Sequence, residues 1–160
     1  MKAYPASKLL ELSLGLEKDT QKLYKDWAKK FSRLPEVAAF WRDYAEEEAI
    51  HIRLLKELRA RLSASQLATL IECEVVGDTR QLLLLLRKEK VDDVEQAFQY
   101  ADKLEHSEIN PLFIVIVSFF EEDEEARAMV RLLLDKHINK LVKNFPKSFL
   151  TPQPRREIKV

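Results

Sequence analysis

The segment Glu46-Glu47-Glu48-Ala49-Ile50-His51 places a carboxylate and an imidazole on the apolar face of a predicted long helix. Alternating steps of four and three residues trace that face along the sequence, as Val37, Trp41, Tyr44, Glu48, His51 and Leu55. An ionised side chain stays in a helix core only when it is paired or bound to a cation. Glu48 and His51 are three residues apart, so both reach the same side of the helix about one turn apart and can bind one metal ion.

The composition predicts a single all-α domain. The chain has 160 residues, enough for one domain with a real core. Its only glycines are Gly15 and Gly77, and Leu, Ala, Glu, Lys and Arg are abundant, which favours helices over strands and tight hairpins. Lys and Arg number 27 and Asp and Glu number 27, so bulk charge argues against a nucleic-acid or anionic-membrane partner.

Cysteine usage and hydropathy predict a soluble cytoplasmic protein. Cys73 is the only cysteine, so neither an internal disulfide nor a four-thiolate metal site is expected, and a reducing compartment fits. The first five residues are followed by no apolar run typical of a signal sequence. The longest uncharged apolar stretch, residues 111–120, is too short to span a bilayer, so no membrane partner is expected.

The first two helices are predicted to form an antiparallel pair. Ser7 is a candidate cap for the first, which should end near residues 32–34, and Pro35 should open the second, which runs to about Arg61. The short loop between them requires antiparallel packing. The inward face of the first helix is Leu10, Leu14, Glu17, Thr20, Tyr24, Trp27 and Phe31.

A long connection containing short helices should follow, opened by a capping box at Ser63–Gln66. A second capping box, Asp92–Glu95, should start the third helix, whose inward face carries Glu105 and Glu108 and which Pro111 should kink. The acidic run 121–125 suits the first turn of a fourth helix. The inner face of that helix is Ala126, Val130, Leu134, His137 and Leu141. The bundle is assigned to residues 1–145, and residues 146–160, rich in proline, to an extended tail.

An internal repeat relates the two halves of the chain. Glu17 and Glu105 are 88 residues apart, and His51 and His137 are 86 apart, each on the inner face of its helix. The inward polar residues are Glu17, Glu48, His51, Glu105, Glu108 and His137. Carboxylates with imidazoles suit iron, manganese or zinc, and bridging carboxylates can hold two such ions close together. Without metal, the clustered carboxylates would raise one another's pKa, and most would be protonated.

The residues Leu16-Glu17-Lys18-Asp19 with Tyr24, the segment 46–51 and the segment 97–105 resemble the rubrerythrin branch of the ferritin-like superfamily over residues 7–145. The resemblance implies a four-helix bundle with a long crossover between helices two and three and a non-haem di-iron site. Matching positions assign its ligands to the six residues above. It further implies reduction of hydrogen peroxide or oxygen at the reduced site, with electrons from a rubredoxin-like domain.

Two departures from that family pattern bear on function. Leu134 stands three residues before His137, where the family has a second bridging carboxylate, and Asp135 lies about 200° around the helix from His137. The second metal should therefore bind weakly, and a mononuclear site is an alternative. Since the chain lacks a rubredoxin-like cysteine set, electrons would come from a separate donor protein.

Other interpretations remain open at this stage. A metal-free bundle that binds a partner or oligomerises competes with the metalloprotein, and iron storage in a shell is a third alternative. A homodimer is expected by resemblance alone. Tyr24 and Tyr44 are interpreted as core residues rather than hydrogen-bond donors to the glutamates.

Overall fold

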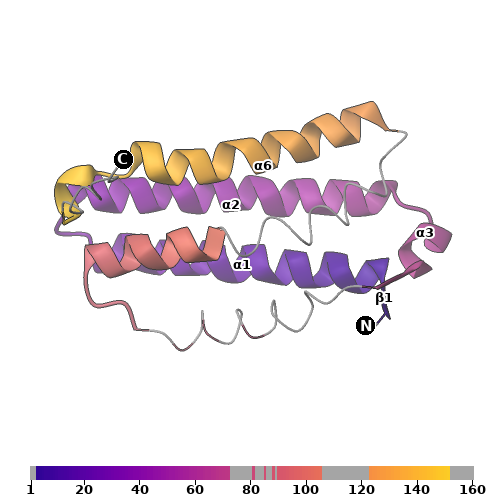
Figure 1. The fold of residues 1–160 in the computed structure, drawn as a ribbon, viewed down its shortest axis with the longest axis horizontal. Helices are drawn as coiled ribbons and strands as arrows, with labels where there is room; N and C mark the ends of the chain where they lie inside the picture. The colour runs from indigo at the N-terminus through magenta and orange to yellow at the C-terminus, as the bar shows by residue number, and fades with distance from the viewer. Residues whose placement is uncertain are drawn as a thin grey trace, which may run out of the picture.

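The structure, a computed structural model, describes residues 3–72, 81, 85, 88, 90–105 and 123–151, without the side chains of residues 131–138. Long helices dominate it: α1 (Ala6–Lys30), α2 (Pro35–Arg61), a helical segment at residues 94–105 and α6 (Glu124–Asn144). Short elements are α3 (Ala64–Ala68), the 3-10 helix η1 (Lys147–Phe149), and the strands β1 (Ala3–Pro5) and β2 (Leu70–Glu72). The helices lie side by side along one long axis (Figure 1), as an all-α ferritin-like bundle requires.

The α1–α2 pair confirms the first two predicted helices. Every residue of both predicted inward faces is buried. Pro35 occupies the first turn of α2, as predicted, because its fixed φ suits that position and its missing N–H costs nothing there. Ser7 is not the cap of α1: the helix begins at Ala6, with Pro5 at the N-cap and no side-chain cap. The helix ends at Lys30, slightly before the predicted residues 32–34.

A two-stranded antiparallel pairing was not expected from the composition. β1 pairs with β2 in the register Ala3 with Glu72, and the N–H of Ala6 donates to the carbonyl of Thr69 at 2.9 Å. The capping box of α3 forms as predicted, with Ser63 and Gln66 exchanging hydrogen bonds. Together these contacts hold the start of α1 against the segment that follows α2.

The third helix starts one residue later than predicted. Asp93, not Asp92, accepts from the N–H of Gln96 at 2.8 Å, and the Gln96 side chain accepts from the N–H of Asp92 at 2.9 Å. In Figure 1 this segment runs along α1, and α6 runs along α2. Leu104 packs against Leu16 of α1. The predicted kink at Pro111 lies outside the described residues.

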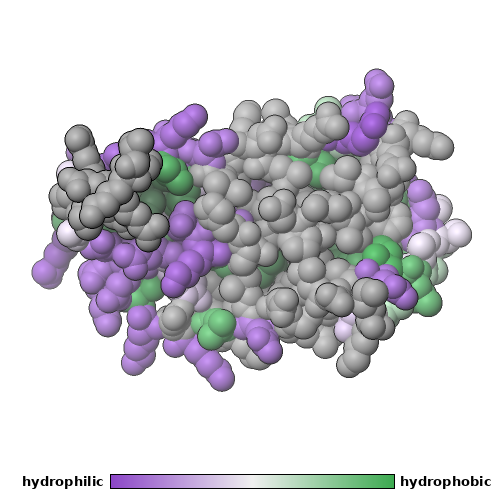
Figure 2. All heavy atoms as spheres, viewed as in Figure 1, coloured by the Kyte–Doolittle hydropathy of each residue, from purple (hydrophilic) through white to green (hydrophobic). Residues whose placement is uncertain are grey.

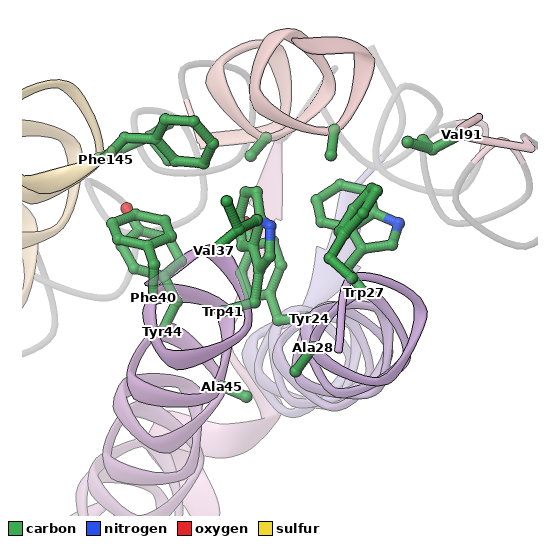
Figure 3. Packing of buried hydrophobic residues seen from close by; sticks show 14 residues of the cluster. Tyr24, Trp27, Ala28, Val37, Phe40, Trp41, Tyr44, Ala45, Val91 and Phe145 are labelled. Atoms are coloured by element: carbon green, nitrogen blue, oxygen red, sulfur yellow. The ribbon is translucent and has the colours of Figure 1, made fainter. Parts of the chain in front are cut away.

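An aromatic cluster fills one end of the bundle (Figure 3). The rings of Tyr24 and Trp41 stack with their centroids 5.3 Å apart. The ring of Phe145, just after α6, packs edge-on against Phe40 with the two centroids 4.9 Å apart. Such pairs contribute about 0.5–1.5 kcal/mol each beyond the area they bury. The cluster therefore joins α1, α2 and the end of α6.

An aliphatic cluster fills the other end and consists of Leu10, Leu14, Leu55, Leu58, Leu62, Ala126 and Val130. Along α1, Glu17 and Thr20 lie between this cluster and Tyr24; along α2, Glu48 and His51 lie between Leu55 and Tyr44. The buried polar residues thus form a layer between two apolar ones.

The predicted tail is not extended at its start. Lys147–Phe149 form η1, and Phe149 and Leu150 pack against the aromatic cluster; residues 152–160 lie outside the described part. On the face of the molecule drawn in Figure 2, many hydrophilic residues gather toward one end, and hydrophobic residues lie in small groups. Within the described residues, no helix is both long and apolar enough to cross a membrane.

Candidate metal centre

Three of the six predicted ligands converge between α1 and α2. Glu17 comes from α1, Glu48 and His51 come from α2, and one ligand atom of each lies within 4.8 Å of the others. Nδ1 of His51 is 3.3 Å from Oε2 of Glu17 and 3.1 Å from Oε2 of Glu48. The predicted spacing of three residues on α2 therefore brings both side chains to one point, where α1 adds the third.

The cluster is almost inaccessible to water. Glu17 is 6% exposed, Glu48 1% and His51 9%. Taking two carboxylates out of water costs several kcal/mol per ion unless a positive charge compensates. In the protein without metal, protons bound by the cluster reduce this cost.

Burial raises the pKa of Glu17 to about 8, and the neighbouring charge of Glu48 adds to the rise. Burial lowers the pKa of His51, but hydrogen bonds to Glu17 and Glu48 outweigh it and raise the value to about 9. Both pKa values are raised, so near neutral pH the metal-free cluster holds more protons than the same side chains do in the unfolded chain. A metal ion must displace these protons in order to bind, so its affinity should depend on pH.

Glu105 is also buried, at 2% exposure, and Tyr24 Oη donates to its Oε1 at 2.5 Å. Tyr24 is fully buried, and its pKa lies well above the ordinary value because of burial and the charges of Glu105 and Glu48. The hydroxyl therefore stays protonated and donates at neutral pH. Glu105 does not belong to the group of described residues whose ligand atoms all lie within 4.8 Å of one another.

Tyr24 is the site residue that the sequence reasoning missed. The sequence pattern predicts a core residue at position 24, and Tyr24 does pack in the aromatic cluster, but its hydroxyl also donates to the predicted ligand Glu105. The available signal was its position on the inward face of α1, two turns after Glu17.

The remaining predicted ligands are not described at side-chain level. Glu108 lies outside the described residues, and of His137 and Leu134 only the backbone, within α6, is described. Their ligand roles, and the effect of Leu134, stay predictions.

In a comparison with protein-family models, the model described as Rubrerythrin matches residues 8–137. The chain belongs to the rubrerythrin family. The rubrerythrin match covers most of α1, all of α2 and most of α6, and it includes all six predicted ligands. No curated protein and no solved structure matches the chain.

The donor set fits the kind of metal that the resemblance implies. Two carboxylates with one imidazole suit iron, manganese or zinc, and burial between two apolar layers would shield a bound ion from water. A cavity of about 410 Å³ lies elsewhere, lined in part by Lys90, Gln99, Tyr100 and Lys103. The candidate metal centre is the ligand cluster, and none of its three residues lines this cavity.

Proposed function

We propose that this protein is a non-haem iron protein of rubrerythrin type that reduces peroxide with electrons from an external donor. The observation that carries the proposal is the buried convergence of Glu17, Glu48 and His51. When bound, ferrous iron supplies electrons, and hydrogen peroxide takes up two electrons and two protons to yield two water molecules.

Each described residue has a definite part in this proposal. Glu17 and Glu48 bind through carboxylate oxygens, and His51 binds through a ring nitrogen once its proton has left. Tyr24 keeps its proton and donates to Glu105, which fixes the direction in which that carboxylate points. The apolar clusters on both sides exclude bulk water.

The number of ions is part of the proposal. The first ion binds at Glu17, Glu48 and His51, all of which the described fold brings together. A second ion would depend on Glu105, Glu108 and His137. It should bind more weakly than the first, because Leu134 stands where the family has a further carboxylate ligand. Manganese or zinc would suit the same ligands.

A second candidate function is a metal-free bundle that binds a partner or forms a homodimer. It is favoured by the hydrogen bonds from His51 to both glutamates, which compensate the buried charges without a metal. The two functions differ in metal content.

The deciding experiment is elemental analysis of protein purified without chelators, and again after anaerobic loading with ferrous iron. We expect about one tightly held ion per chain, and about two only at excess iron. His51→Gln and Glu48→Gln should remove the tight ion, whereas Glu46→Gln, an exposed change on the same helix, should not. Absence of iron after loading would contradict the proposal and favour the metal-free bundle.

A further inference from the structure

The solvent face of α1 carries a row of four lysines. Lys18, Lys22, Lys25 and Lys29 follow one another at steps of four, three and four residues, and all are exposed. At 1.5 Å rise per residue, the row is about 16 Å long. We name these four residues the lysine face.

Most of the positive charge on the lysine face is not neutralised by the fold. Lys22 pairs with Asp26 at 2.6 Å, but both side chains are largely exposed, so the pair is screened by solvent. Lys18, Lys25 and Lys29 form no ion pair with any residue that the structure describes. Because the whole chain has a formal charge of zero, the lysine face is a local concentration of positive charge.

The lysine face lies beside the metal centre. Lys18 directly follows the ligand Glu17, and Lys25 directly follows Tyr24, which holds Glu105. A molecule bound on this side of α1 is separated from the ligands by about one helix diameter, ~10 Å.

The proposed function requires a reductant from outside this chain. The only cysteine is Cys73, so the chain cannot form a cysteine-ligated iron–sulfur centre of its own. In the proposed function the electrons come from an external donor, and a protein donor must approach the buried ligands from a surface close to them.

We propose that the lysine face docks an acidic surface of the electron-donor protein. Charge complementarity of this kind steers two proteins together and orients them, and small, transient contacts are enough for electron transfer. A nucleic acid is a poorer fit, because four positive charges over about 16 Å, on a chain whose net charge is zero with these lysines counted, neutralise few phosphates. This inference rests on the proposed function and adds the docking surface to it.

The test uses a negatively charged rubredoxin as the donor. Binding of oxidised rubredoxin is measured by NMR titration, which needs no electron transfer, and reduction of the iron-loaded protein by reduced rubredoxin is followed by stopped flow. The variant Lys18→Glu/Lys22→Glu/Lys25→Glu/Lys29→Glu should reduce the association rate by about 10- to 100-fold, and raised salt should weaken binding to the unaltered protein.

The matched control reverses four other exposed cations, in Arg53→Glu/Lys56→Glu/Lys143→Glu/Lys147→Glu. It changes net charge equally and should bind rubredoxin clearly better than the lysine-face variant. Equal effects of both variants, no detectable binding, or tighter binding of duplex DNA than of rubredoxin would overturn the docking inference. Reduction by neutral hydroquinone and iron content report on the metal centre separately, so their failure identifies a fault in the proposed function instead.

Discussion

At the scale of single residues, the site depends on how burial changes ordinary side chains. Glu17 and His51 are both buried, and each alters the charge state of the other. The sequence predicted both as inward-facing because the 3.6-residue period of a helix is visible in the apolar pattern. It could not show that Tyr24 reaches Glu105, because those residues are 81 positions apart and meet only after the helices pack.

The Tyr24 hydroxyl should stabilise the fold through Glu105. Tyr24→Phe keeps the ring in the aromatic cluster and leaves a buried carboxylate without this donor, so the free energy of unfolding should fall by about 1–3 kcal/mol. Urea unfolding of the metal-free protein measures the change. Tyr4→Phe, in β1, is the control and should cost little; an equal loss in both variants would contradict the role of the hydrogen bond.

The stability of the metal-free protein should fall as pH rises. Relative to the unfolded chain, the pKa values of Glu17 and His51 are raised, from 4.5 to about 8 and from 6.5 to about 9. The folded state therefore binds more protons, and the stabilisation is complete below pH 4.5 and lost through pH 9. Iron-loaded protein should show the opposite trend, because protons displace metal at low pH.

Thermal unfolding from pH 5 to 9, with chelator and with iron, measures both trends. Glu17→Gln removes one of the two titrations and should flatten the decline of the chelated protein. A chelated protein whose melting temperature rises across this range would show that the cluster is not protonated as described.

At the scale of elements, local signals located most helices to within a few residues. Pro35 started α2 as predicted, and the Ser63 capping box formed. The third helix started one residue late because Asp92 and Asp93 are equivalent as caps in sequence, and the side-chain geometry chose Asp93. The β1–β2 pair was missed, since three-residue strands carry no periodic signal and form by long-range pairing.

Position 134 on α6 should control the second metal. Leu134→Glu restores a carboxylate one turn before His137 and should raise the tightly held iron from about one to about two ions per chain. Leu133→Glu is the matched control, because position 133 lies about 100° around the helix from position 134. Elemental analysis after ferrous loading reads the result, and equal iron in both variants would count against the alignment of α6 with α2.

At the scale of the whole molecule, the two apolar clusters hold the helices at a spacing that lets the polar layer form. Phe145 joins segments that are distant in sequence: its ring centroid lies 4.9 Å from that of Phe40 and 4.8 Å from that of Phe98. Arg61 also pairs with Asp123 at 3.5 Å, and Lys140 with Glu47, so α6 is held to α2 near both of its ends. Packing of the apolar side chains contributes most of the stability of these helix contacts, because exposed ion pairs contribute little.

Phe145→Ala should destabilise the bundle by about 3–5 kcal/mol, because the ring is 2% exposed and its loss leaves a cavity. Phe149→Ala, at a half-buried ring of η1, should cost clearly less. Denaturant unfolding compares the two variants. Iron content of folded Phe145→Ala should be unchanged at low temperature, since the residue lies in the aromatic layer rather than among the ligands; loss of iron without loss of stability would contradict that separation.

The sequence by itself determined the helical architecture and the inward positions of Glu17, Glu48, His51 and Glu105, because helical periodicity and burial are local properties of the chain. Only the tertiary structure decided which of these residues meet. Packing of α1 on α2 brings Glu17 close to Glu48 and His51, whereas Glu105 accepts a hydrogen bond from the Tyr24 hydroxyl. The physical reason is that ligand distances and pKa values depend on neighbours from other helices, whose relative position follows from the packing of the two apolar clusters.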